Sequence, residues 1–185
     1  MNRWTNYKTM PYTPFHFGPS GFIALTFRKW IDVPVFVLAN VIVDIEVLVL
    51  MLLGTAWPVH RYCHTLLIGA AVGVVWGLAA YLLRNFFKKI MRIFHISYKT
   101  GFWKMLISGV LGVWFHVVVD AIYHRDVRMF WPSDATPLYG LLTQQQVNII
   151  CTIFFIPAII LYILVVIAFL KNNSAETKVG EKEGR

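Results

Sequence analysis

The sequence contains few charged residues. Only 14% of its 185 residues are Asp, Glu, Lys or Arg, and 58% are hydrophobic, whereas a soluble domain usually has about a quarter charged and about half apolar residues. Charge is absent altogether from Thr65–Leu83 and from Gln146–Leu170. Each run is long enough to cross a bilayer as a helix, which takes roughly 20 residues. The composition therefore argues against an ordinary soluble domain and predicts an integral membrane protein.

Cysteine and acidic residues are scarce too. The two cysteines, Cys63 and Cys151, form no paired or metal-type motif, so a disulfide framework is not indicated. Nine acidic residues face 17 basic ones, for a net charge of +8. Much of the basic excess falls between two apolar spans, at Arg84, Lys88, Lys89, Arg92, Lys99 and Lys104. Because the cytoplasmic loops of membrane proteins are rich in Lys and Arg, this clustering predicts a cytoplasmic loop and no nucleic-acid partner.

Five segments are candidate membrane crossings. Besides the two uncharged runs, Val33–Leu53 and Phe102–Tyr123 are largely apolar, and Gly18–Phe27 is uncharged. Gly18–Phe27 has only ten residues, about 15 Å as a helix, which is short for a crossing. We therefore predict an all-α, polytopic helical membrane protein with about five transmembrane segments, of which the first is short. The alternative has four crossings, with the short segment at the membrane interface.

The polar residues favour five crossings over four. With five, His16, the turn Trp57–His64 and the helix end His116–His124 all lie on the extracytoplasmic side, whereas with four His16 lies at the opposite face. No internal repeat is evident, so we expect residues 1–170 to form a single transmembrane helical domain. Residues 171–185 mix Lys, Glu, Asn and Gly without apolar periodicity, which predicts a flexible polar tail.

The stretch GVWFHVVVDAIYH, residues 112–124, places ionisable groups at the end of an apolar segment. Such groups are costly in lipid and by default indicate function. His116 and Asp120 are four residues apart, so they share one face of a helix, and His124 lies one turn further on. His60 and His64 have the same spacing after Pro58, a residue that suits a helix start. We expect two helix ends to present these pairs at the same membrane surface.

Imidazole and carboxylate groups together are the usual ligands of zinc and similar ions. An ion would neutralise carboxylates in a low-dielectric setting and give the polar groups a partner, so we predict a metal site rather than a purely structural polar network. The expected ligands are His16, Asp44, His60, His64, His116 and Asp120. His60 and His64 can both bind, or one can bind while the other serves catalysis. His124 is a weaker candidate.

Four sequence blocks carry a family resemblance. They are TPFHFGPS with His16, ANVIVDIE with Asp44, HRYCHTLL with His60 and His64, and FHVVVDAIYHRDVRMFWPSDATPLYG with His116 and Asp120. In this order they resemble the YdjM-like family of membrane-bound metal-dependent hydrolases. Many members have four residues between the histidines of the third block, whereas this chain has three, which leaves open which of the two is the ligand. The resemblance also suggests Met10 as the natural start.

The order His, Asp, His, then His-x-x-x-Asp is similar to that of zinc-dependent phospholipase C and single-strand nucleases. This resemblance implies cleavage of phosphate esters by clustered zinc ions. A further downstream His-x-x-x-Glu is missing here, so we expect one or two ions, with zinc as the metal, rather than three.

The expected function is therefore a membrane-embedded metal-dependent hydrolase that uses a metal-activated water. Asp120 and His64 are the expected catalytic groups, and Arg61, Arg125 and Arg128 are expected to bind an anionic head group. We expect a prokaryotic inner membrane, with membrane lipids as surroundings and a lipid-linked or phosphoester substrate. The five-crossing topology places the site on the extracytoplasmic side. The alternatives are a non-catalytic, metal-stabilised scaffold or binding protein and, less favoured, a proton or metal transporter.

Overall fold

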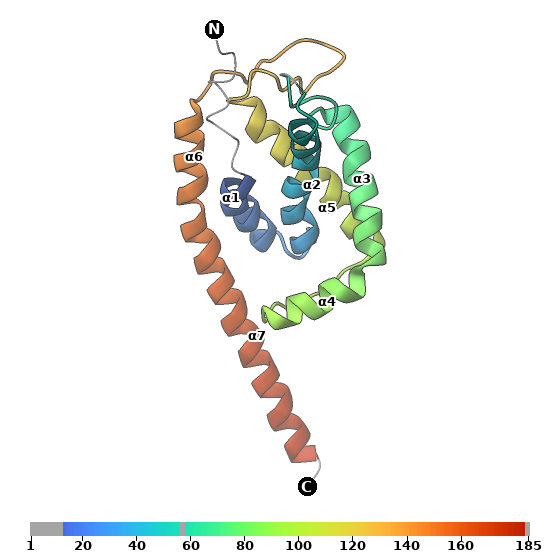
Figure 1. Ribbon diagram of the computed structural model, residues 1–185. Helices are drawn as coiled ribbons and strands as arrows, with labels where there is room; N and C mark the ends of the chain where they lie inside the picture. The colour runs from blue at the N-terminus through green and yellow to red at the C-terminus, as the bar shows by residue number, and fades with distance from the viewer. Residues whose placement is uncertain (1–12, 56–57, 184–185) are drawn as a thin grey trace.

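The computed structural model describes residues 13–55 and 58–183 of the chain. Within this part, every element of regular secondary structure is a helix, which confirms the predicted all-α class. The elements are α1 (Thr13–Thr26), α2 (Val33–Leu52), α3 (Leu66–Leu82), α4 (Arg84–Ile93), α5 (Phe102–Ala121), α6 (Gln144–Ile153) and α7 (Phe155–Glu183) (Figure 1).

The long helices run up and down between two ends of a bundle (Figure 1). By length and composition, α2, α5 and the run Gln144–Ser174 can each cross a membrane. α3 and α4 pass the same test only together, as a pair bent by 76°, and add a fourth crossing if the pair counts as one span. The 14-residue α1 corresponds to the predicted short first segment, so the predicted count of about five is consistent with the structure.

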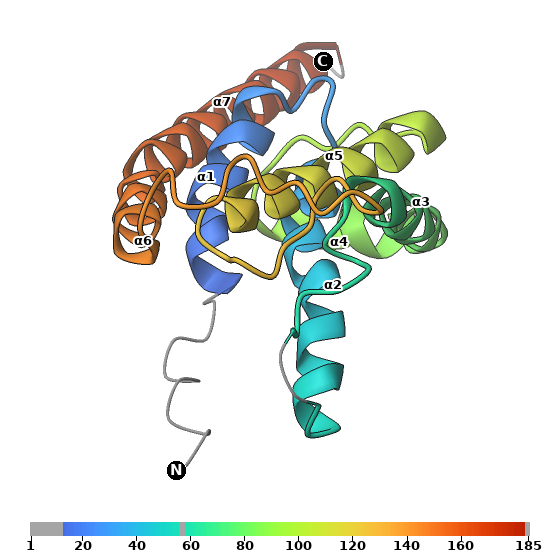
Figure 2. The ribbon, with the colours of Figure 1, turned by 90° about the horizontal axis from the view of Figure 1, so that it is seen from above.

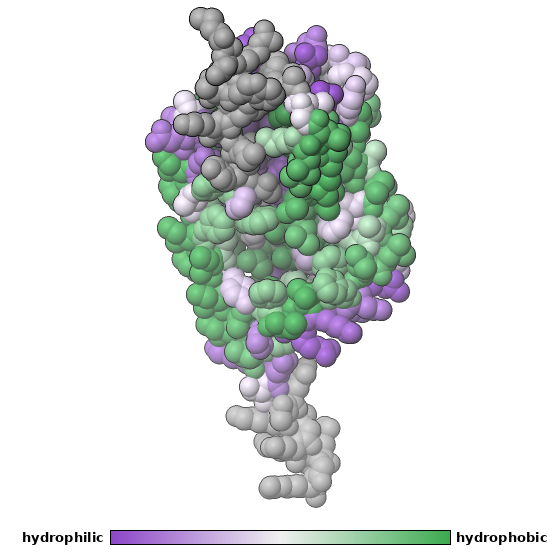
Figure 3. Space-filling model, viewed as in Figure 1, coloured by the Kyte–Doolittle hydropathy of each residue, from purple (hydrophilic) through white to green (hydrophobic). Residues whose placement is uncertain are grey.

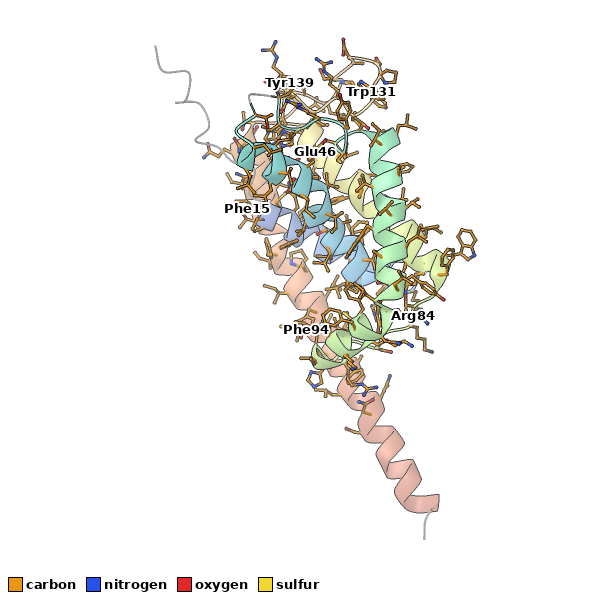
Figure 4. All side chains as sticks on the ribbon, turned by 45° about the vertical axis from the view of Figure 1, so that its right-hand side comes forward. Phe15, Glu46, Arg84, Phe94, Trp131 and Tyr139 are labelled. Atoms are coloured by element: carbon orange, nitrogen blue, oxygen red, sulfur yellow. The ribbon has the colours of Figure 1, made fainter. Side chains whose placement is uncertain are left out.

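The two ends of the bundle differ in character. At one end α4 lies across the helices, and Arg84 and Phe94 mark its two limits in Figure 4. At the other end lie the loop before α3 and the loop of residues 122–143, which passes over the helix ends in Figure 2. Glu46, Trp131 and Tyr139 mark this second end in Figure 4. Between the ends, apolar side chains cover most of the visible surface (Figure 3), as a bilayer requires.

Glycines bring α3 and α5 into close backbone contact. A Cβ on Gly73 would lie 2.5 Å from Cα of Val110 and 2.8 Å from the carbonyl oxygen of Gly109. A Cβ on Gly77 would lie 2.7 Å from Cα of Leu106. Small residues at such spacing let membrane helices pack closely. This contact fixes α5, which carries His116, against the helix that follows the His64 loop.

A buried carboxylate ties the α4 end of the bundle together. Asp32 precedes α2 and is fully buried, and its carboxylate accepts hydrogen bonds from the hydroxyls of Tyr98, at 2.9 Å, and Thr100. The backbone N–H of Asp32 donates to Ser108 in α5 at 2.7 Å. Burial raises the pKa of this carboxyl. Sequence analysis did not single out this network, because its partners lie 66 to 76 positions away.

The predicted polar tail from Lys171 begins within α7, which runs to Glu183. Lys, Ala and Glu are good helix formers, so a helix here agrees with the composition. The predicted flexibility of this segment stays a prediction.

Candidate metal centre

Four of the predicted ligands meet at the end of the bundle opposite α4. Asp44 comes from α2, His116 and Asp120 come from α5, and His64 comes from the loop just before α3. Each offers one ligand atom, and these four atoms all lie within 4.8 Å of one another. The close helix packing thus brings together residues that are up to 76 positions apart in the chain.

The nitrogen and oxygen atoms of this group face one another closely. His116 Nε2 lies 3.1 Å from Asp44 Oδ1 and 3.1 Å from Asp120 Oδ2, as the four-residue spacing of His116 and Asp120 predicted. His64 Nε2 lies 3.5 Å from Asp44 Oδ1 and 3.9 Å from Asp120 Oδ2. The side chains of His64, His116 and Asp120 are fully buried. The group is therefore a compact set of two imidazoles and two carboxylates shielded from solvent.

Three atoms of this group fit a cation. Among the described residues, Nε2 of His64, Nε2 of His116 and Oδ2 of Asp120 are buried without completing a hydrogen bond. Leaving a buried polar atom unsatisfied costs about 1–3 kcal/mol. A divalent ion would accept all three, and histidine with carboxylate is the donor set that zinc prefers. The residues present therefore fit a metal ion.

Glu46 fixes the orientation of His64. Its Oε2 lies 3.3 Å from His64 Nδ1, and its carboxylate also accepts backbone N–H bonds from Arg61, Tyr62 and Cys63 at 3.0–3.3 Å. A proton held on Nδ1 leaves the Nε2 lone pair directed at the centre, the usual arrangement of a metal-ligating histidine. Glu46 lies two residues after Asp44 in α2, and its contact with Nδ1 makes it a residue that supports His64.

His16 and Tyr123 hold the α5 ligands in the same way. His16 Nδ1 lies 3.1 Å from His116 Nδ1, and His16 Nε2 lies 3.4 Å from Asp120 Oδ1. The Tyr123 hydroxyl donates to Asp120 Oδ1 at 2.9 Å. These contacts occupy His116 Nδ1 and Asp120 Oδ1, so the other polar atom of each side chain, His116 Nε2 or Asp120 Oδ2, faces the centre. His16, a predicted ligand, therefore contacts two members of the group of four and is not itself a member.

His60 belongs to a second group, with His124 and Asp126, whose ligand atoms also lie within 4.8 Å of one another. Asp126 Oδ2 lies 3.0 Å from His60 Nδ1. Burial opposes ionisation of Asp126, but its hydrogen bonds with His60 outweigh burial and lower its pKa to about 2. Burial lowers the pKa of His124 to about 4, so its ring is neutral at pH 7. Asp126 was not among the predicted residues.

The helical placement of His60 and His64 was wrong. We expected them to share a helix face, but α3 begins at Leu66, after the N-cap Thr65, whose side chain accepts a bond from the Ile68 N–H at 3.1 Å. The two histidines lie in the preceding loop, and their rings are 4.7 Å apart. Backbone N–H groups of this loop donate to the carboxylates of Glu46 and Asp126 and not to the carbonyls of a preceding helical turn. Trp57, the predicted start of this turn, and Met10 lie outside the described residues.

The predicted substrate-binding arginines lie in the loops at the same end. Arg61 Nε donates to the Pro58 carbonyl at 2.9 Å. Arg125 and Arg128 are exposed, and Arg128 pairs with exposed Asp134 at 2.7 Å. No ligand contact tests their predicted role, which stays a prediction.

Comparison with known proteins finds one family. The model of the family described as "YdjM inner membrane protein" matches residues 19–180, which contain both groups of ligands but not His16. No curated protein and no solved structure matches the chain.

Proposed function

The chain belongs to the YdjM inner membrane protein family, and from this premise we propose that it is a membrane-embedded, metal-dependent hydrolase acting on a phosphoester of a lipid or lipid-linked molecule. The observation that carries the proposal is the convergence of Asp44, His64, His116 and Asp120, whose buried ligand atoms lie within 4.8 Å of one another. Burying two carboxylates is costly unless positive charge balances them, and a divalent cation bound by these residues would supply that charge.

The residues of the centre would hold a divalent ion, with zinc favoured by the donor set. Such an ion, when bound, supplies Lewis acidity that activates water and an ester oxygen. Glu46 keeps a proton on His64 Nδ1, and His16 together with Tyr123 keeps His116 Nε2 and Asp120 Oδ2 directed inward. His64, His116 and Asp120 thus each have one atom anchored and one atom directed at the centre, which is the pre-organisation that catalysis requires.

The location of the site suggests the substrate class. The centre lies at the end of the bundle opposite the basic helix α4, which carries Arg84, Lys88, Lys89 and Arg92. By the positive-inside rule α4 faces the cytoplasm, so we infer that the centre faces the extracytoplasmic side. Exposed Arg125 and Arg128 lie in the loop that follows α5. Arginine binds phosphate in a bidentate manner, and these two would hold an anionic lipid head group at the membrane surface.

The proposal is tested by measuring the metal content and the phosphoesterase activity of the full chain purified in detergent. Wild-type protein should carry close to one zinc ion or more per chain and release phosphate or head group from anionic phospholipid vesicles or from a soluble aryl phosphodiester. His116→Ala with Asp120→Ala should lose zinc and activity. His95→Ala serves as the control, because His95 lies at the opposite end of the bundle, after α4.

Two results would overturn the proposal in different ways. Folded wild-type protein that cannot be loaded with zinc or manganese would show that the buried group is a polar packing network. Zinc-loaded protein that hydrolyses no phosphomonoester or phosphodiester would instead favour a metal-stabilised scaffold, the rival that the sequence left open.

A further inference from the structure

A second set of metal-ligating side chains lies beside the centre and has no role in the function proposed so far. We propose that His60 and His124, with Asp126 supporting His60, form a second divalent-cation site, so that the chain holds a pair of neighbouring ions. The inference deepens the proposed hydrolase and rests on it for its chemistry, but its binding test does not depend on activity.

The atoms of this set are arranged for an ion. The rings of His60 and His124 lie 4.3 Å apart between centroids with an interplanar angle of 35°. His60 is only 3% exposed, and among the described residues the Nε2 atoms of both His60 and His124 are buried without completing a hydrogen bond. Two buried nitrogens without a hydrogen-bond partner each carry a desolvation cost. A shared cation removes that cost.

Asp126 prepares His60 for binding. Its Oδ2 accepts from the backbone N–H groups of Val59, at 3.2 Å, and His60, at 3.1 Å, and it lies 3.0 Å from His60 Nδ1. The proton is therefore on Nδ1, and the lone pair of His60 Nε2 is free. A carboxylate behind a histidine is the standard support of a metal-ligating imidazole. Glu46 has the same relation to His64, so both loop histidines are supported alike.

The two sets are adjacent. The His60 and His64 rings are in edge contact, with centroids 4.7 Å apart, and His64 is a member of the first group. Closely spaced pairs of ions are a recurring arrangement in enzymes that hydrolyse phosphate esters, where one ion supports the attacking oxygen and the other the leaving oxygen. Both loop histidines are thus used, one by each site, which answers the question that their spacing left open.

The experiment measures zinc stoichiometry on the full chain in detergent. Protein stripped with a chelator is reloaded with zinc, freed of excess by gel filtration and analysed for metal per chain. Five proteins are compared: wild type, His124→Phe, Asp126→Asn, His116→Ala and the control His95→Ala. Phenylalanine keeps an aromatic ring between His60 and Tyr123 and has no ring nitrogen to bind metal. The Tyr123 ring centroid is 4.2 Å from that of His124. Asp126→Asn is a second variant that keeps the side-chain shape.

We expect two zinc ions in wild type and in His95→Ala, and one ion in His124→Phe and in Asp126→Asn. The ion that His124→Phe retains also reports that the fold has survived. Cobalt loading gives a second readout, because two adjacent cobalt ions couple magnetically and one does not, so the coupled signal should vanish in His124→Phe.

The possible failures are separable. If wild type binds one ion and His124→Phe keeps it, or if wild type and His124→Phe both bind two, the second site is refuted while the first centre stands. If His116→Ala leaves the zinc content unchanged and His124→Phe removes all of it, the first centre is refuted and the second stands. If wild type binds no zinc, both are refuted.

Discussion

The substitution Glu46→Gln tests whether a residue that supports a ligand determines how tightly the centre binds metal. Glu46 contributes no ligand atom to the group of four, but its carboxylate lies 3.3 Å from Nδ1 of fully buried His64. Glutamine keeps the volume and removes the charge. The proton on His64 Nδ1 then loses its anionic acceptor, and the Nε2 lone pair becomes a weaker and less well-oriented donor.

The expected loss follows from the contacts. Changing a residue that supports a metal ligand typically lowers metal affinity about 10- to 100-fold, which is about 1.4 to 2.7 kcal/mol. The metal-free protein should be destabilised as well, because three backbone N–H groups of the His64 loop donate to Glu46. Hydrogen bonds to a charged group are worth about 1.5–3 kcal/mol and neutral ones about 0.5–1.5 kcal/mol, so we expect a loss of about 1–3 kcal/mol in stability.

The assay is zinc competition against a fluorescent chelator, paired with thermal unfolding in excess chelator to isolate the metal-free contribution. Asp134→Asn is the matched control. It removes one negative charge at the same end of the bundle, from a side chain that is 78% exposed and pairs with Arg128. It should therefore change affinity less than about twofold, as expected for a screened surface charge. Equal zinc affinity of Glu46→Gln and wild type, or an equal loss in Asp134→Asn, would refute the reasoning.

Three further predictions address the fold and the protonation of the site. Gly73→Ala should destabilise the bundle by about 1–3 kcal/mol, because the new Cβ would lie 2.5 Å from Cα of Val110. Thermal unfolding measures this loss. The control Gly21→Ala, whose Cβ would meet only Ala158 at 4.0 Å, should be neutral or stabilising. Asp32→Ala should lower the unfolding free energy by about 2 kcal/mol, because it leaves the half-buried hydroxyls of Tyr98 and Thr100 without this acceptor. Zinc content should stay at the wild-type value, and a loss of zinc would show that the two ends are coupled. Zinc affinity should fall at least about tenfold between pH 7.5 and 5.5, because histidine binds metal only when neutral and ordinarily protonates near pH 6.5. Zinc affinity that does not change with pH, measured by competition with the fluorescent chelator, would contradict a histidine-ligated site.

Much of the site could be predicted because its chemistry is unusual for its location. Asp44 and Asp120 are carboxylates within otherwise apolar segments, and His116 precedes Asp120 by one helical turn, so a shared face followed from helix geometry alone. The positions of His60 and His64 were also identified, but for a wrong reason. Their four-residue spacing was taken for a helix, whereas the segment is a loop whose backbone and side chains are held by Glu46 and Asp126.

The supporting residues could not be predicted, because their partners are distant in sequence. Asp126 meets His60 across 66 positions, and Glu46 meets His64 across 18. Tyr123 lies only three residues from Asp120, but tyrosine near a membrane interface is commonplace and gave no signal. The available clue was the run of ionisable residues that continues from Asp120 through His124 to Asp126.

The sequence by itself determined the class of the protein. Long uncharged runs of about 20 residues fit helices in a bilayer, since a helix satisfies all of its backbone hydrogen bonds within the segment, and the basic cluster distinguishes the two ends. Only the tertiary structure decided how the polar residues are shared. The close α3–α5 contact at Gly73 sets the loop histidines beside α5, and the anchoring of each Nδ1 decides which nitrogen is left to bind. Spacing along one helix cannot encode that choice, because it depends on carboxylates supplied by other segments.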